Sequence, residues 1–181
     1  MVQTPLDGRP IVTVRPTERI FKFRVRSCSD IRIDLLGHTS NTSFINYYFE
    51  IGVLSNTETK LYKNKNNQYQ LLKSEITRDV LHCHFMRDYW IMFSAEGTFV
   101  FGTGRDMENQ LLSYVDFDLI AIHALSLRSM NQIADWELQK SSGTSTIFYA
   151  NDNYNHVWLQ QYEFASTPIV FLVRSCSDAN L

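Results

Sequence analysis

An alternation of apolar and polar residues runs through most of this chain, and this period of two is the pattern of half-buried β-strands. It is clearest over residues 21–25 and 31–35, where apolar and charged side chains alternate strictly. Residues 47–53 supply a third apolar face. Polar turns then lead into a partner strand over 58–63 and a short strand over 69–72.

The second half of the chain continues the same pattern. The apolar runs 89–93 and 98–102 are joined by a polar turn, which predicts a β-hairpin. Residues 117–127 alternate less cleanly and suggest a central strand covered on both faces. Residues 106–114 allow at most a short helix, and no segment keeps a helical period through three turns. We therefore predict an all-β fold, an antiparallel β-sandwich or jelly-roll-like domain.

Residues 23–30 (FRVRSCSD) return as residues 171–178 (FLVRSCSD), identical at seven of eight positions and 148 residues apart. An internal repeat at this spacing indicates one structural unit followed by the start of a second. We expect a complete domain over 1–140, a connection over 141–154 and a truncated start of a second copy over 155–181. The alternative is that strands of the second copy pair with an edge of the first unit, or mediate self-association.

The repeat carries three chemically notable residues twice: Arg26, Cys28, Asp30, Arg174, Cys176 and Asp178. We expect the arginine to pair with a carboxylate on a neighbouring strand and the aspartate to occupy a turn. With Cys83, the chain has three cysteines, an odd and small set that predicts buried or free thiols. Cys28 and Cys176 occupy equivalent positions in two units, so we do not expect them to bond to each other.

Charge and hydropathy restrict the class of protein. A net charge of -2 and a pI near 6.2 argue against nucleic-acid binding, which needs a basic face. No apolar run approaches the roughly 18 residues of a membrane-spanning helix. Residues 1–8 show neither a basic nor an apolar segment of a secretory signal, so the cytoplasm is the favoured compartment, although the sequence leaves this open.

Two motifs resemble chemical sites, and in both the structural interpretation is the favoured one. Residues 100–104 (VFGTG) could cradle a cofactor, but they follow a hairpin strand and so predict a turn or bulge. His82 and His84 flank Cys83 at a spacing that can bind zinc, with Asp88 and His123 as further candidates. Surface or partly buried histidines fit this pattern better.

Aromatic residues beside polar ones give the candidate ligand site. Many β-sandwiches bind sugars or peptides on such platforms. The candidate residues are Tyr48, Tyr62, Tyr89, Arg105 and Trp136. Ordinary core and rim side chains are nevertheless the favoured interpretation of the aromatic residues, because protein surfaces carry many apolar atoms.

Several segments together resemble the farnesoic acid O-methyltransferase-type domain of arthropod and other animal proteins, which often occurs in tandem. The matching segments are residues 23–30, 48–52 with Asn56, 89–91, 97–104 and 135–137. Their order and spacing carry the resemblance, which covers roughly residues 20 to 140. The sequence departs from it at 125–131, where relatives usually carry a turn rich in Gly and Trp.

The resemblance implies two functions that conflict. The family name implies methylation of farnesoic acid with S-adenosylmethionine, a step towards juvenile hormone or methyl farnesoate. The resemblance also implies an all-β domain, whereas familiar methyltransferases of this kind hold the cofactor on a doubly wound sheet. We favour a non-catalytic module that recognises a carbohydrate, lipid or protein and needs no cofactor; the methyltransferase, with S-adenosylmethionine, is the alternative.

Overall fold

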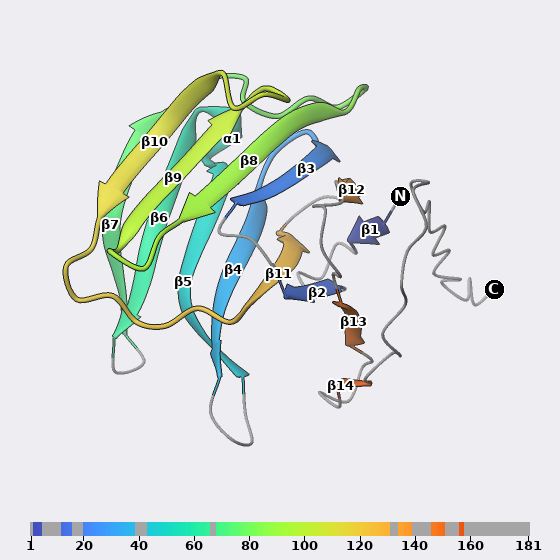
Figure 1. The fold of residues 1–181 in the computed structure, drawn as a ribbon. Coiled ribbons are helices and arrows are strands. Elements are labelled where there is room, and N and C mark those ends of the chain that lie inside the picture. Colours follow the sequence, from blue (N-terminus) through green and yellow to red (C-terminus); the bar gives the residue numbers. More distant parts are fainter. Residues whose placement is uncertain are drawn as a thin grey trace.

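Two antiparallel sheets make up the fold (Figure 1), as the sequence predicts. The computed structural model describes residues 2–4, 12–15, 20–38, 43–65, 68–130, 134–138, 146–150 and 156–157. One sheet has the strand order β1 (Val2–Thr4), β12 (Ala134–Leu138), β3 (Ile20–Arg26), β8 (Arg87–Phe93), β9 (Thr98–Thr103) and β10 (Asn109–Val115). The other has the order β14 (His156–Val157), β13 (Thr146–Ala150), β2 (Val12–Arg15), β11 (Ala124–Ser129), β4 (Ile31–His38), β5 (Ser43–Gly52), β6 (Glu58–Lys65) and β7 (Gln68–Ile76).

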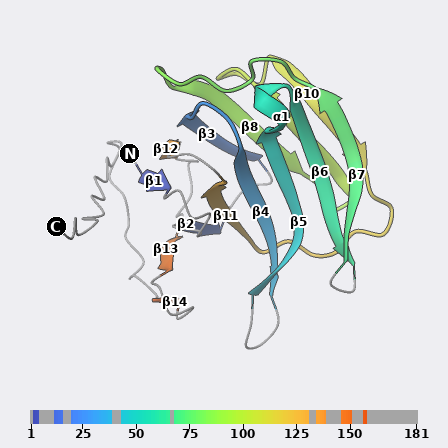
Figure 2. The same ribbon diagram turned by 180° about the vertical axis from the view of Figure 1, so that it is seen from behind.

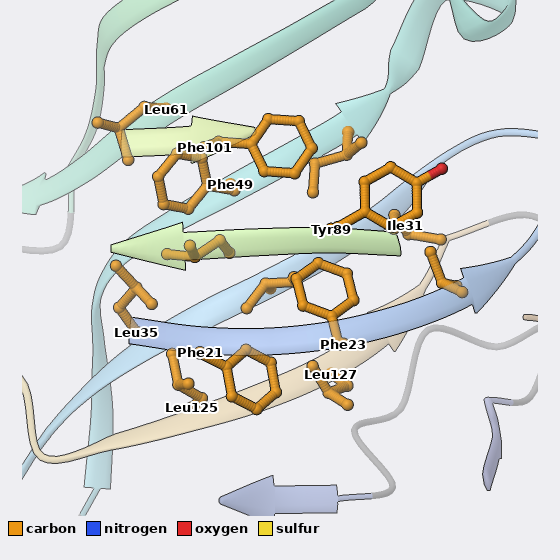
Figure 3. Packing of buried hydrophobic residues seen from close by; sticks show 14 of the residues in the cluster. Phe21, Phe23, Ile31, Leu35, Phe49, Leu61, Tyr89, Phe101, Leu125 and Leu127 are labelled. Carbon is orange, nitrogen blue, oxygen red and sulfur yellow. The ribbon is translucent and has the colours of Figure 1, made fainter. Parts of the chain in front are cut away.

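The core lies between the two sheets and is built from the residues that the alternation predicts. In β3 every second residue is buried, and Phe23 and Val25 are completely inaccessible. Figure 3 shows Phe23, Tyr89 and Phe101 close together, with ring centres 5.5 Å apart for Phe23 and Tyr89 and 6.0 Å for Tyr89 and Phe101. Leucines and isoleucines of the eight-stranded sheet pack against these rings. In β3 the buried face fixes the register of the strand.

The predicted strands over 21–25, 31–35, 47–53 and 58–63 and the predicted hairpin of 89–93 with 98–102 are confirmed as β3, β4, β5, β6 and the β8–β9 pair. Among the described residues, α1 (Val53–Asn56) is the one helical segment, a single turn with left-handed φ angles that joins β5 to β6. The helical residues in the described ranges provide no segment of the length and apolarity that a membrane crossing requires.

Two predictions about local structure are wrong. Residues 106–114 do not form a short helix, because Asn109–Val115 is strand β10, which pairs with β9 at the edge of its sheet. Residues 117–127 are not one central strand, because 117–123 form a connection and β11 begins only at Ala124. For Asn109–Val115 the pairing with β9, rather than local composition, decides the outcome.

Strands β13 and β14 extend the eight-stranded sheet beyond β2. Thr146–Ala150 lies inside the predicted connection and pairs with β2, and His156–Val157 pairs with β13. Residues 158–181, and with them Arg174, Cys176 and Asp178, lie outside the described residues. The division into one complete and one truncated unit therefore stays a prediction.

The prediction that all cysteines are thiols is wrong. Cys28, in the turn between β3 and β4, forms a disulfide with Cys83, in the segment between β7 and β8. Their Cα atoms are 4.2 Å apart, although 55 residues separate them in sequence. The sheets bring the two residues together, and this proximity cannot be read from cysteine spacing.

A polar cluster anchors the connection that follows β10. Lys63 faces the interior from β6, and its Nζ lies 2.7 Å from Oδ2 of Asp116. The hydroxyl of Tyr47 donates to the same oxygen at 2.8 Å and accepts a hydrogen bond from the amide of Ile120. Burial alone raises the pKa of Asp116, but the hydrogen bonds from Lys63 and Tyr47 outweigh it, so this pKa lies below its ordinary value.

We expect Asp116→Asn to lower the free energy of unfolding by about 3 kcal/mol near neutral pH, because the buried ammonium of Lys63 loses its buried carboxylate and keeps only the exposed one of Asp118, 3.3 Å away. A lowered folded-state pKa stabilises the protein above the ordinary carboxylate pKa, and this contribution disappears as pH falls through the folded-state value. The stability difference between wild type and variant should therefore shrink at acidic pH. Urea unfolding across a pH series measures it, with Glu75→Gln, which removes a carboxylate from an exposed ion pair with Lys73, as a control that changes little. A difference independent of pH would contradict the assignment.

We expect reduction of the Cys28–Cys83 bond to lower the free energy of unfolding by up to about 4 kcal/mol, the loop-closure value for a loop of this length. The Cys28→Ser/Cys83→Ser double variant should show the same loss and no further response to reductant. Peptide mapping by mass spectrometry tests the connectivity directly. Recovery of Cys28 and Cys83 as free thiols from protein prepared under oxidising conditions would refute it.

Candidate functional site

The outward side chains of β11, β4, β5, β6 and β7 form a surface that we call the outer face. Successive residues of a strand point to opposite sides, so Tyr47 lies in the core while Tyr48 lies on the outer face. Figure 2 views the molecule from the side of β4–β7. The residues used below are Arg32, Asp34, Tyr48, Glu50, Lys60, Tyr62, Tyr69 and Arg128.

Three of these side chains form a stack across neighbouring strands. The ring of Tyr48 lies against that of Tyr62 on β6, with centres 4.6 Å apart and planes inclined by 14°. On its other side, the guanidinium carbon of Arg32 lies 3.6 Å from the centre of the Tyr48 ring. A cation over a ring face is an attractive arrangement. The stack therefore runs from β4 through β5 to β6.

Tyr69 covers this stack from the edge of the sheet. It belongs to β7, two strands from β5, yet its ring centre is 5.1 Å from that of Tyr48, with the planes nearly perpendicular at 78°. The side chain must reach over β6 to achieve this. As a result Tyr48 is only 5% exposed, whereas Tyr69 keeps 51% of its surface open to solvent.

A buried carboxylate holds the arginine in place. Asp34 has no exposed surface, and its Oδ1 accepts a hydrogen bond from Nε of Arg32 at 2.6 Å. Its other oxygen accepts from Nε of Arg128, on the neighbouring strand β11. Burial alone lowers the pKa of Arg32, but its ion pair with Asp34 more than offsets this, and the net shift is upward. One carboxylate therefore orients two guanidinium groups.

The tyrosines of the stack remain neutral at ordinary pH. Burial, followed by the nearby charge of Glu50, raises the pKa of Tyr48 to about 12. Burial also raises the pKa of Glu50, which lies opposite Arg32 and Lys60 in the strand register. The outer face thus combines protonated phenols, which can donate and accept hydrogen bonds, with fixed charges.

A hollow of about 380 Å³ lies at the end of strands β6 and β7. Its described walls are Lys65, Gln68, Tyr69 and Gln70. The ammonium of Lys65 is 2.8 Å from a carboxylate oxygen of Asp118. Tyr69 belongs to both the stack and the walls of the hollow, whereas Gln68 and Gln70, which flank it in β7, pair with Lys65 and the interior-facing Lys63 and so leave the sheet on its inner side.

The structure brings together only two of the five ligand-site residues predicted from the sequence, Tyr48 and Tyr62. Tyr89 and Trp136 are buried in the core, where Tyr89 donates a hydrogen bond to the carbonyl of Val80. Arg105 is exposed in the connection between β9 and β10. Core packing accounts for Tyr89 and Trp136.

Sequence reasoning missed Arg32, Asp34, Tyr69 and Arg128. A signal for Arg32 and Asp34 existed, because both alternate with the apolar residues of β4 and so had to share a face with Tyr48. Tyr69 offered no such signal. Its position depends on a bulge in the β6–β7 pairing and on the reach of its side chain.

The repeat residues have structural roles in the first copy. Arg26 pairs with Asp135, its register partner on β12, which confirms the predicted pairing of arginine with a carboxylate across strands. Asp30 lies in the turn before β4 with a left-handed φ of 52°, a conformation that aspartate tolerates well. Cys28 forms the disulfide described above.

The glycine-containing segment 100–104 and the histidine pair His82 and His84, which resemble a cofactor loop and a zinc site in sequence, also have packing roles. A Cβ at Gly102 would lie 2.3 Å from the carbonyl oxygen of Asn109 and 2.4 Å from the Trp90 ring, so glycine allows close packing of β9. The backbone amide of His84 donates to Nδ1 of His82, whose ring stacks on Phe85. The described part of the chain contains no group of three or more side chains arranged to hold a metal.

We expect Asp34→Asn to destabilise the protein by about 3 kcal/mol, because the partly buried Arg32 and Arg128 lose their shared, fully buried carboxylate. Urea unfolding measures this loss. The matched control is Glu58→Gln, which removes a carboxylate from an exposed ion pair with Lys60 on the same face and should have little effect. Equal losses in the two variants would show that Asp34 is not the centre of the site.

Solved structures similar to this chain are β-sandwich proteins of low sequence identity. Sheep galectin-11 in complex with glycerol shares 10% identity, covering 81% of this chain and 96% of that one with a TM-score of 0.49. The carbohydrate-binding module CBM66 from Bacillus subtilis also shares 10%, covering 74% and 81% with a TM-score of 0.45. CG-16, a homodimeric agglutinin from chicken liver, shares 10%, covering 81% and 98% with a TM-score of 0.44. The strand pairing of this chain itself establishes the sandwich.

The sequence has no significant match among curated proteins. Residues 7–142, in contrast, match the family described as farnesoic acid O-methyltransferase. This match spans most of the chain and includes every segment on which the resemblance in sequence was based. The chain therefore belongs to the farnesoic acid O-methyltransferase domain family.

Proposed function

We propose that this protein is a non-catalytic recognition module that binds its ligand on the outer face of the eight-stranded sheet. The observation that carries the proposal is the stack of Arg32, Tyr48 and Tyr62, covered by the half-exposed Tyr69 beside a hollow. These side chains are held by one another and by the buried carboxylate of Asp34 before any ligand arrives. Such preorganisation lowers the cost of binding.

The walls of the hollow favour a polar ligand over a long apolar chain. Among the described residues that line it, Lys65, Gln68 and Gln70 carry amide or ammonium groups. A carbohydrate or a polar protein segment suits such a lining, whereas a terpenoid or acyl chain requires an apolar slot. Of the carbohydrate, lipid and protein ligands expected from the sequence, the lipid is therefore the least favoured.

The alternative function is methylation of farnesoic acid, which the family name suggests. Its chemical demand is mild, because a carboxylate is already a nucleophile and mainly needs positioning beside the methyl donor. The reaction nevertheless requires a site for S-adenosylmethionine and a slot for a sesquiterpene chain. The outer face, with its filled aromatic stack and polar hollow, suits neither. We propose that the module works without a cofactor.

The disulfide bears on the compartment in which the module acts. Bonds of this kind persist in oxidising compartments and are rare in the cytosol. Cys28–Cys83 therefore supports an oxidising compartment rather than the cytoplasm expected from the sequence. We also propose tandem use or self-association through residues 155–181, on the basis of the repeated segment at 171–178.

We expect the purified chain to bind a member of an array of immobilised glycans, lipid headgroups and peptides, and Tyr62→Ala to lose this binding because the stack collapses. Phe85→Ala is the control, since Phe85 is an exposed aromatic residue between β7 and β8, outside the outer face. In parallel, incubation with S-adenosylmethionine and farnesoic acid should give no methyl ester by mass spectrometry. Ester formation, or binding that survives Tyr62→Ala, would overturn the proposal.

A further inference from the structure

We infer that two copies of this chain associate through strand β10, which lies at a free edge of the six-stranded sheet. The two β10 strands pair antiparallel about a two-fold axis at Ser113. This inference goes beyond the proposed recognition function and does not depend on it. Three features of β10 support it: its composition as an edge strand, the direction of its backbone groups and its symmetry about Ser113.

The composition of β10 leaves this edge open to pairing. Among the described residues the two sheets end in four strands, β1, β10, β14 and β7. Edge strands expose unpaired N–H and C=O groups, and proteins commonly protect them by keeping them short or by placing charges on them. β1 has three residues and β14 has two, while β7 carries the ion pair of Lys73 with Glu75. β10 has seven residues and contains neither a charged side chain nor a proline. It is therefore the least protected of these edges.

The backbone of β10 has groups available for a further strand. The amide of Asp116, directly after β10, donates to the carbonyl of Gly97 at 2.9 Å, so the backbone groups of Asp116 point towards the β9 side. Pairing with β9 is regular from Leu112 to Val115, beyond a bulge near the start of β10. Backbone groups alternate in direction along an antiparallel strand. Those of Ser113 and Val115 therefore point away from β9, where none of the described strands pairs with them.

The symmetry of β10 favours a second copy of the chain over an unrelated strand. An antiparallel pairing about Ser113 places Leu112 opposite Tyr114 of the partner subunit and Val115 beside Leu111 of the partner subunit. Apolar residues thus face apolar ones, and no like charges are opposed. An axis one residue later would instead oppose an apolar side chain to a carboxylate. The pairing about Ser113 is the isologous contact that two-fold homodimers use.

Exposed apolar side chains at the end of β10 would be covered by the same pairing. Val115 has 41% of its surface exposed, and Phe117, two residues further on, has 96%. The connection that carries Phe117 is held to the sandwich by the ion pairs of Asp116 with Lys63 and of Asp118 with Lys65. In the pairing about Ser113, positions 115 and 117 of one copy lie beside positions 111 and 109 of the other. Their removal from water stabilises the dimer.

The interface is separate from the other surfaces discussed above. Figures 1 and 2 show β10 next to β7, at the end of the sandwich away from β13 and β14. The pairing uses different residues from the association proposed for 155–181. Because the outer face belongs to the eight-stranded sheet, a dimer joined through the six-stranded sheets carries two outer faces. Two linked binding faces raise the apparent affinity for a ligand that presents repeated groups.

Charge substitutions at the axis test the pairing. Ser113→Lys opposes two ammonium groups and Ser113→Glu opposes two carboxylates, so we expect each variant alone to dimerise about tenfold or more weakly than wild type. An equimolar mixture of the two variants should recover the dimer, because opposite charges then face each other. Sedimentation velocity over a concentration series measures the association. The control is Ser74→Lys, the same substitution on edge strand β7, which should associate as wild type does.

Hydrogen exchange locates the contact in the wild-type chain. In the monomer the amides of Ser113 and Val115 face solvent and should exchange fast, whereas those of Leu112 and Tyr114 are bonded to β9 and should be protected. Raising the protein concentration should slow exchange at Ser113 and Val115. Residue-resolved NMR measures these rates. If the charged variants lose the circular dichroism of the folded chain, this measurement decides alone.

Several results would overturn the inference. One is a wild-type chain that stays monomeric at high micromolar concentration. Another is a dimer that folded Ser113→Lys leaves intact, or a mixture of folded charge variants that fails to recover it. A dimer without slower exchange at Ser113 and Val115 would place the contact elsewhere, for example at residues 155–181. None of these results affects ligand binding by the outer face, which Tyr62→Ala tests separately.

Discussion

The structure depends on one constraint, the burial of the inner faces of two sheets against each other. A strand exposes alternate residues on opposite sides, so fixing the inner residues also fixes the outer ones. In β5, Tyr47 is in the core, where it bonds Asp116, while the next residue, Tyr48, is stacked with Tyr62 on the outer face. A slip of one residue would exchange the two tyrosines. The candidate site is therefore positioned by the core beneath it.

Strands with one clearly apolar face were predictable from the sequence, and those that lack one were not. In β3, β4 and β5 the inner residues carry most of the hydrophobic burial, so the local pattern and the fold agree. Strand β10 begins with Asn109 and Gln110 and lies at a sheet edge, so its pairing with β9 rather than its composition defines it. The Cys28–Cys83 bond and the Lys63–Asp116 ion pair join segments distant in sequence. Such contacts become visible only once the sheets are assembled.

The candidate site, like the fold, was predictable from the sequence only in part. Tyr48 was identified from the sequence, and the alternation in β4 contained the information that Arg32 and Asp34 would face it. The contribution of Tyr69 was not predictable, because a bulge shifts the register of β7 and the side chain then crosses a whole strand. Tyr89 and Trp136 illustrate the opposite error, since residue type alone does not tell a ligand platform from a core ring.

The mutual contacts of the side chains in this site argue for recognition rather than for chemistry on a bound substrate. A methyl-transfer centre must exclude water around two reactants, which requires a deep or closing cavity. The outer face is instead a surface of side chains that satisfy one another: Asp34 orients Arg32, Arg32 covers Tyr48, and Tyr69 closes over both. An open site gains affinity mainly by not having to order itself on binding. A stack that is assembled before the ligand arrives, on a sheet held by a buried ion pair and a disulfide, meets that requirement.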